Sequence, residues 1–302
     1  MQLGLQLPSF TFPGGPGTIR ATLTEIAQAA EAAGFASLWV MDHFYQLGED
    51  TWLGSPDQPM LEAYTTLGFL AQATSRIALG PMVAGVHFRH PGALVKQATT
   101  LDVLAGPGRT YLGLGAGWYA REAHGLGFPF PERGERFERL EETLQVARAM
   151  FAGDRAPING RHYQLAEPIN VPLPLSQPRP RIMVGGNGPR RTTDLVARYG
   201  DACNILVPDP GESRRLVDTI HARCLEIGRD PAEVETTSLV EADFRAGRMQ
   251  PADLVRIAGE QASEGIQHVI VNLPDAHRTE QLAVIGREVV PELLEVTVPV
   301  PS

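Results

Sequence analysis

Eight short apolar runs alternate with longer amphipathic stretches along the whole 302-residue chain. Short apolar runs are typical of buried strands, and amphipathic stretches that stop at a glycine, such as Gly34 or Gly228, are typical of helices. Because parallel strands need crossover connections, strands that alternate with helices predict a parallel sheet. Eight such units predict a closed (β/α)8 TIM barrel, with a doubly wound open sheet as the alternative. The predicted strands are residues 3–7, 37–41, 77–83, 109–114, 181–184, 202–207, 235–240 and 267–272.

The segments between the strands predict helices and one insertion. Residues 153–180 interrupt the alternation between the fourth and fifth strands, and they are rich in proline. We expect an insertion there that forms a hairpin or a covering loop around residues 162–165. No low-complexity linker divides the chain, so residues 1–302 are interpreted as one barrel domain. The predicted helices are residues 19–33, 61–74, 135–151, 192–199, 213–227, 251–263 and 279–290, and one that begins at Pro91.

The composition excludes several classes of partner. The net charge is −9 and the sequence pI is about 5.4, which is unfavourable for binding nucleic acid or an anionic membrane. No apolar run is long enough to span a bilayer, and no zinc, Walker or serine-nucleophile motif is present. The two cysteines, Cys203 and Cys224, have no metal or redox spacing. We therefore expect a cytoplasmic protein without a metal site.

Asp42 and His43 directly follow the apolar run of the second predicted strand. In a barrel, the C-terminal ends of the strands surround the active site. Histidine is the side chain whose ordinary pKa lies nearest neutral pH, so it exchanges protons under working conditions. The alternative is a helix-capping aspartate followed by a packed histidine.

A glycine-rich turn follows the fifth predicted strand and contains Gly185, Gly186, Asn187 and Gly188. Glycines let the backbone approach a ligand and expose its N–H groups, and the next helix adds the positive end of its dipole. With the cations of residues 190–191, the turn is a candidate phosphate site. The alternative is a tight turn with two solvated arginines.

Two further segments carry weaker signals. The run Gly-Leu-Gly-Ala-Gly at residues 113–117, before Trp118, lacks the third glycine of a dinucleotide fingerprint at the required spacing. It predicts either a surface on which a flat ring lies or a simple tight turn. Arg89 and His90 precede a helix start, where they form either a clamp for phosphate or carboxylate, or a helix cap and an ion pair at the barrel rim.

Taken together and in this order, these motifs resemble the bacterial luciferase-like flavin and deazaflavin oxidoreductases, and within them the branch that uses coenzyme F420. The resemblance covers nearly the whole chain. It implies a (β/α)8 barrel with an insertion between the later strands, commonly as a homodimer, that acts on a small-molecule substrate. The matching segments are residues 34–44, 76–80, 88–91, 100–104, 112–118, 182–188 and 197–204.

The resemblance also implies roles for individual residues. Coenzyme F420 would carry a hydride, and His43 would act as general base or acid at the reactive edge of its ring, with Asp42 behind it. A non-proline cis peptide at Met82–Val83 would support the back of the ring, and the glycine-rich turn would hold the coenzyme phosphate. The expected catalytic residues are His43 and Asp42. The expected cofactor-binding residues are Asp42, Met82, Val83, Ala84, Ala116, Gly117, Trp118, Val184, Gly185, Gly186, Asn187 and Gly188.

The chain departs from the sugar-phosphate dehydrogenases of this branch. They have a tryptophan after the Asp-His-Phe run and a proton-donating glutamate after the Gly-x-Gly turn, where this chain has Leu47 and Trp118. Glu122 is near enough in sequence to replace that glutamate. Because Lys96 is the only lysine, the chain lacks the lysine group suited to a sugar phosphate.

Tyr45, Trp52, Phe88 and Trp118 instead predict an apolar, aromatic substrate cleft. Two alternatives to F420-dependent hydride transfer remain open from the sequence. One is an FMN-dependent monooxygenase supplied with reduced flavin by a separate reductase. The other is a catalytically silent flavin-binding protein.

Overall fold

The computed structural model describes residues 1–48, 53–206, 211–245 and 247–299. Within these ranges, nine strands form one parallel sheet in the order β3-β2-β1-β11-β10-β9-β8-β5-β4. The two edge strands, β3 and β4, follow each other in the chain, so the sheet closes on itself as the predicted barrel. The strands are β1 (Gln2–Leu7), β2 (Ser37–Val40), β3 (Ala78–Pro81), β4 (Ala84–Gly85), β5 (Tyr111–Gly115), β8 (Arg181–Gly185), β9 (Ala202–Leu206), β10 (Glu235–Glu241) and β11 (His268–Asn272).

The third predicted strand, residues 77–83, is divided into two segments. β3 pairs with β2 and β4 pairs with β5, and the peptide bond between Met82 and Val83 is cis, as the family resemblance predicted. An isolated bridge also joins Leu79 of β3 to Thr110, just before β5. The barrel therefore has eight positions around its circumference, and the third is occupied by two short segments.

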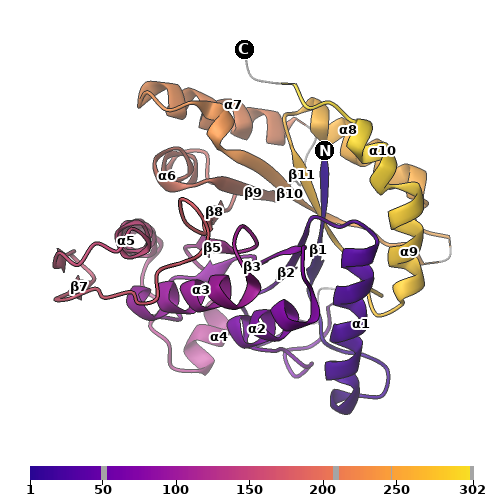
Figure 1. Ribbon diagram of the computed structural model, residues 1–302, viewed down its shortest axis with the longest axis horizontal. Helices are drawn as coiled ribbons and strands as arrows, with labels where there is room; N and C mark the ends of the chain where they lie inside the picture. The colour runs from indigo at the N-terminus through magenta and orange to yellow at the C-terminus, as the bar shows by residue number, and fades with distance from the viewer. Residues whose placement is uncertain (49–52, 207–210, 246, 300–302) are drawn as a thin grey trace.

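Figure 1 shows the helices arranged around the outside of the strands. Side chains cap the N-termini of two of these helices. The Glu62 side chain accepts hydrogen bonds from the N–H groups of Tyr64 at 3.2 Å and Thr65 at 2.7 Å, and His90 caps the helix that begins at Pro91. The helices are α1 (Ile19–Ala32), α2 (Ala63–Ala73), α3 (Pro91–Ala105), α4 (Ala120–Gly125), α5 (Arg133–Phe151), α6 (Arg191–Tyr199), α7 (Glu212–Glu226), α8 (Pro251–Ser263), α9 (Thr279–Glu288) and α10 (Val290–Glu295), with 3-10 turns η1 (Pro16–Thr18) and η2 (Pro231–Glu233).

Two helices differ from the prediction. The sequence analysis missed α4, because its six residues are too short to show a helical period. The predicted last helix, residues 279–290, is instead two helices, α9 and α10. Pro291 lies in the first turn of α10, where its missing N–H needs no partner but cannot extend the hydrogen-bond ladder of α9.

The insertion between β5 and β8 contains the predicted hairpin, formed by β6 (Ile158–Asn159) and β7 (Gln164–Leu165) in antiparallel pairing. Two buried or half-buried carboxylates hold it against the helices. Glu142 of α5 accepts the N–H groups of Arg161 at 2.8 Å and Tyr163 at 3.0 Å. Asp102 of α3 accepts the N–H group of Leu175 at 2.7 Å. The insertion is thus anchored at both ends.

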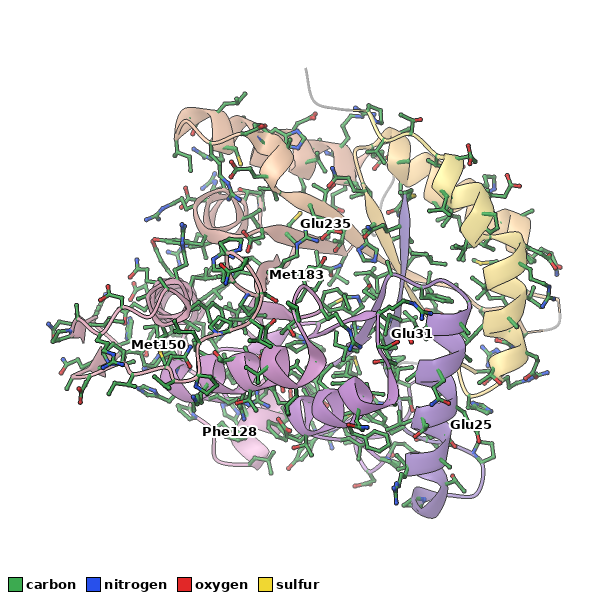
Figure 2. The ribbon with its side chains drawn as sticks, viewed as in Figure 1. Glu25, Glu31, Phe128, Met150, Met183 and Glu235 are labelled. Carbon is green, nitrogen blue, oxygen red and sulfur yellow. The ribbon has the colours of Figure 1, made fainter. Side chains whose placement is uncertain are left out.

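The hydrophobic core has two parts. The larger part packs the outer face of the sheet against the helices, and a smaller cluster fills the barrel interior with Trp39, Met82, Tyr111, Met183, Ala202 and Ile270. Figure 2 shows Met183 and Glu235 among the strands inside the ring of helices. Both Cys203 and Cys224 are buried free thiols. None of the helices in the described part of the chain has the length and apolar character needed to cross a bilayer.

A buried chain of hydrogen bonds closes the end of the barrel where the strands begin. The Trp39 indole donates to Ser37 Oγ at 2.6 Å, Ser37 Oγ lies 2.9 Å from His268 Nε2, and His268 Nδ1 lies 3.1 Å from Glu235 Oε1. A carboxylate only accepts, so His268 Nδ1 donates to Glu235. Each donor in this chain therefore has an acceptor, as buried polar groups require.

Glu235 is the charged end of this network. The Tyr111 hydroxyl donates to it at 2.8 Å and Arg181 lies 3.1 Å away. Burial works to raise the pKa of Glu235, but the hydrogen bond and charge of His268, with Arg181 and Tyr111, outweigh it and lower the pKa to about 2. The carboxylate is thus held ionised.

This lowered pKa predicts an acid-dependent contribution to stability. Because the folded pKa lies below the ordinary 4.5, the Glu235 contribution, up to about 3 kcal/mol, is complete above that value and is lost as the pH falls towards 2. Urea unfolding from pH 7 to pH 3 measures it. The difference in free energy of unfolding between wild type and Glu235→Gln should shrink on acidification, whereas Glu233→Gln, at an exposed site, should show no such trend. A difference that stays constant with pH would refute this account.

Candidate functional site

A cavity of about 540 Å³ opens at the mouth, which is the end of the barrel formed by the C-terminal ends of the strands. Most of the predicted site residues meet on its wall. Ala84 and Val184 do not, because they are fully buried in the core between the sheet and the helices. The predicted residues on the wall are Asp42, His43, Met82, Val83, Ala116, Gly117, Trp118, Gly185, Gly186, Asn187 and Gly188.

His43 lies on this wall with an oriented imidazole. Its Nδ1 is 2.5 Å from Glu122 Oε1, and the other carboxylate oxygen of Glu122 accepts the N–H group of Phe44 at 2.8 Å. In the neutral ring Nδ1 therefore carries the hydrogen, and Nε2 presents its lone pair. No hydrogen bond joins Nε2 to another residue among those the structure describes. This nitrogen is free to exchange a proton with a ligand.

The residue behind His43 is Glu122 of α4 and not Asp42, which corrects the expectation from the resemblance. The Asp42 carboxylate, whose side chain is 2% exposed, pairs with both terminal nitrogens of Arg89 at 2.6 and 2.8 Å. It also accepts the N–H group of Gly85 at 3.2 Å. Asp42 thus connects β2 to β4 and to the start of α3.

Arg89 is consequently no clamp for a ligand anion. It contacts Glu62 at 2.6 Å as well as Asp42, and His90 caps α3, so the alternative of a cap and a rim ion pair is correct. Burial disfavours the charged guanidinium, but the hydrogen bonds to Asp42 and Glu62 and the charge of Asp42 outweigh burial and raise the pKa of Arg89. The guanidinium therefore stays charged.

Gly113 and Gly115 serve packing against the divided third strand, whereas Ala116 and Gly117 line the cavity, so a surface for a flat ring at residues 116–117 stays a prediction. A Cβ atom on Gly113 would lie 2.1 Å from the Pro81 carbonyl oxygen, and one on Gly115 would lie 2.7 Å from Val83. A Cβ on Gly185 would lie 3.0 Å from Val83. The missing side chains therefore make room for the divided third strand and for the side chain that follows its cis bond.

The glycine-rich turn after β8 is tied to β9. Gly186 has a φ of +124° and donates its N–H to the Asn204 carbonyl at 3.0 Å. The Asn187 amide donates to the Leu206 carbonyl and accepts the Leu206 N–H at 2.8 Å. Because α6 begins directly afterwards and Thr192 also lines the cavity, the turn exposes backbone next to a positive helix end.

The cations on the cavity wall differ from those predicted. Arg190 and Arg191 do not line the cavity, and Arg191 instead contacts the Gly134 carbonyl at 3.3 Å. Arg133 and Arg136, in the first turn of α5, take their place on the wall. Burial lowers the pKa of Arg136, which still lies far above neutral pH for a guanidinium. Both side chains therefore bring positive charge to the mouth.

Aromatic side chains cover the cavity beside His43. Its ring lies edge-on to Trp118 at 5.7 Å and to Tyr119 at 6.0 Å, measured between ring centroids. Phe88 also lines the cavity, as the predicted aromatic cleft requires. Tyr45 lies outside the lining, against Gly125 of α4, and Trp52 falls outside the described residues.

His87 is a cavity residue that the sequence analysis missed. It is 8% exposed, and both of its ring nitrogens are buried without a hydrogen-bond partner in the described structure. Burial, with the charges of Arg136 and His43, lowers the pKa of His87 to about 4 although the charge of Glu122 opposes this shift. The imidazole is therefore uncharged at neutral pH.

Two other cavity residues that the sequence analysis missed lie at the C-terminal ends of strands, where a barrel places its active site. Gln6, near the end of β1, donates to the Met82 carbonyl at 3.2 Å, and Asn272 ends β11. The polar residues at the ends of the first and last predicted strands are the sequence signal for both. Arg133 and Arg136 lie in the long connection after β5, which shows no periodic signal that marks them. Among the described residues, no group of histidine, cysteine and carboxylate side chains is arranged to hold a metal.

Comparison with known proteins agrees with this geometry. The family profile described as "Luciferase-like monooxygenase" matches residues 1–287. An F420-dependent glucose-6-phosphate dehydrogenase of Beutenbergia cavernae is 30% identical over 285 residues, which cover 82% of this chain and 79% of that enzyme. An F420-dependent hydroxymycolic acid dehydrogenase of Mycobacterium tuberculosis is 29% identical over 287 residues, which cover 88% of this chain and 77% of that enzyme. This chain also has the fold of a solved F420-dependent secondary alcohol dehydrogenase, determined in complex with an F420-acetone adduct. The two structures have a TM-score of 0.81 at 18% sequence identity, and the match covers 97% of this chain and 98% of the other.

The buried Asp42–Arg89 pair predicts a large loss of stability when one partner is removed. Arg89→Met should lower the free energy of unfolding by about 3–5 kcal/mol, because it leaves an uncompensated carboxylate that is almost fully buried. Arg76→Met is the matched control, since Arg76 is 74% exposed and only 4.0 Å from Glu31. Chemical denaturation at pH 7 measures both. Equal losses in the two variants would contradict a structural role for the pair.

Proposed function

Because the chain belongs to the luciferase-like monooxygenase family, we propose that it is an oxidoreductase that uses coenzyme F420 to transfer a hydride to or from a small organic substrate. The observation that carries this proposal is the Nε2 of His43, which has no hydrogen-bond partner in the described part of the chain. It lies on the wall of a ring-sized cavity while Glu122 holds Nδ1. The F420 dependence of the two relatives supports the choice of coenzyme.

The residues at the mouth fit a planar coenzyme with a phosphate. A cavity of about 540 Å³ lies within the range of cofactor sites, about 300–1,000 Å³. Met82, Val83 and Gly117 would contact the ring, and Gly186 to Gly188 with the start of α6 would hold the phosphate. Arg133 and Arg136 add positive charge on the same wall. When bound, F420 supplies the hydride acceptor or donor.

The chain's own residues handle the proton. In the oxidation of an alcohol, His43 Nε2 takes the proton of the substrate hydroxyl, and in the reverse direction it returns that proton to the carbonyl oxygen. Glu122 fixes the tautomer and stabilises the imidazolium that forms, as the carboxylate of a catalytic triad does. Trp118 and Tyr119 lie edge-on to the imidazole at this edge of the cavity.

The substrate is an uncharged organic alcohol or ketone, and a sugar phosphate is disfavoured. The only lysine, Lys96, donates to the Val171 carbonyl on the insertion and does not line the cavity. The side of the cavity near His43 is aromatic and aliphatic, with Leu47 and Phe88 on its wall. The homodimer and the cytoplasmic location stay predictions from the sequence.

The choice of coenzyme is tested by fluorescence titration of the protein with F420 and with FMN. We expect F420 to bind in the micromolar range and FMN more weakly. Gly186→Val should weaken F420 binding at least tenfold, because a side chain at a φ of +124° strains the turn that faces the phosphate. Gly259→Val, with open space around it on α8, is the control. Preferential binding of FMN would overturn the choice, and unchanged affinity of Gly186→Val would place the phosphate elsewhere.

The role of His43 is tested by turnover. With F420 and a panel of secondary alcohols, His43→Asn should keep coenzyme affinity and lose about 10²–10⁴-fold in kcat, the usual worth of a general base. His124→Asn, on the exposed end of α4, is the matched control and should retain activity. Loss of the visible absorbance of oxidised F420 reports the rate. Full activity of His43→Asn would remove it from the mechanism, and coenzyme binding without turnover in wild type would favour a silent binding protein.

A further inference from the structure

A second hollow, here called the side pocket, adjoins the cavity at the mouth. It measures about 280 Å³ and shares two wall residues, His87 and Phe88, with the larger cavity. Two segments that do not line the larger cavity contribute to the other walls of the side pocket. They are the loop between α4 and α5, with Phe128 and Pro129, and the insertion, with Tyr163. Figure 2 labels Phe128 near α4. The side pocket has no role in the proton transfer proposed above.

The side pocket has the size and walls of a site for an aromatic ring. An apolar cavity of about 150 Å³ is enough to hold benzene. The rings of Phe44, Phe88 and Phe128 contact one another, with centroid separations of 5.0 Å for Phe44–Phe88 and 5.3 Å for Phe88–Phe128. Because Phe44 follows His43 in the chain, this aromatic wall has a fixed position relative to the proton-transferring imidazole.

The two arginines that line the side pocket are already paired with carboxylates, so they offer little attraction for an anion. Arg139 donates to Glu135 at 2.8 and 2.6 Å and lies over the Tyr163 ring. Arg89, which also borders the pocket, is held by Asp42 and Glu62. A phosphate or carboxylate would have to compete with these carboxylates. An uncharged ring would leave the ion pairs intact.

His87 separates the two hollows and has unmet hydrogen-bonding capacity. Both of its nitrogens lack partners among the described residues, and a buried polar group without a partner costs about 1–3 kcal/mol. The neutral imidazole has one donor and one acceptor, so it can pair with a hydroxyl or a carbonyl without gaining charge. Because both nitrogens are buried, an oxygen next to a ligand's ring pairs with one of them only when the imidazole turns towards the hollow.

We propose that the side pocket is a specificity subsite that takes an aromatic ring of the substrate, with His87 hydrogen-bonding the oxygen next to that ring. This inference rests on the proposed function, because it places the reacting carbon in the larger cavity beside His43. It narrows the substrate class to secondary alcohols or ketones that carry an aryl group. Relatives that act on other substrates would differ at Phe128, Pro129 and His87.

The test is an NMR titration of the F420-loaded protein with 1-phenylethanol and with 2-propanol, which lacks the ring. Wild type should bind 1-phenylethanol at least tenfold more tightly. Pro129→Trp, at an exposed wall position, should fill the side pocket and abolish this preference. Leu126→Trp is the matched control, because Leu126 lies on the same loop, is 47% exposed and lines neither hollow. F420 affinity should be equal in all three proteins.

A second variant tests His87. His87→Leu should weaken 1-phenylethanol at least fivefold and leave ethylbenzene, which lacks the oxygen, unchanged. Equal binding of the two alcohols by wild type, or an undiminished preference in Pro129→Trp, would overturn the subsite. Equal effects of His87→Leu on both aryl probes would overturn the hydrogen bond.

The experiment distinguishes failure of the proposed function from failure of the subsite. If F420 does not bind, the coenzyme assignment fails, and the same titration on the unloaded protein still decides whether the side pocket selects the ring. A preference for the ring that Pro129→Trp abolishes there supports the subsite by itself.

Discussion

Val83 packs against a group of glycines on the neighbouring strands. This contact governs both the closure of the barrel and the shape of its mouth. The third strand is too interrupted to pair along its length, so β3 and β4 divide its pairing between β2 and β5. Gly113, Gly115 and Gly185 leave the space in which Pro81 and Val83 sit. With larger residues there, the strand would have to move away from its neighbours, because interiors are close-packed. The floor of the cavity is therefore a consequence of how the sheet closes.

Two carboxylates near the end of β2 have different roles, one structural and one that orients a histidine, because their surroundings differ. Asp42 is buried against Arg89 and joins β2, β4 and α3. Glu122 comes from the other side of the mouth and orients His43. Both are nearly inaccessible to water, so their hydrogen bonds are strong and their positions are well determined. The imidazole is preorganised between a rigid ion cluster and an aromatic wall, which is what a general base requires.

The mouth has a polar side and an apolar side. The glycine-rich turn, the start of α6 and the arginines of α5 bring positive potential to one side. On the other, His43 lies against Trp118 and Tyr119, and His87 lies against Phe88. Arg136 adjoins both sides, because its charge also acts on His87. Under the proposed function, the first side would hold the anionic coenzyme tail and the second the uncharged substrate.

The sequence by itself determined the class of fold, the eight barrel positions, nearly all the helices and the gathering of His43 with the glycine-rich turn at one end of the sheet. These features follow from local periodicity and from the rule that parallel strands end together. The family resemblance added the coenzyme and the cis bond. Contacts between distant segments were beyond such reasoning.

Only the tertiary structure decided which side chains meet. Glu122 lies 79 positions from His43, and Arg89 lies 47 positions from Asp42, so no pattern along the chain links either pair. The sequence also could not show that Gly113 and Gly115 leave room for Pro81 and Val83, because this depends on how the strands pair. His87 gave no signal at all, since its isolation in the wall between two hollows depends on loops from three parts of the chain. Periodicity is a property of neighbours in sequence, whereas a site depends on the register of strands and the packing of the connections between them.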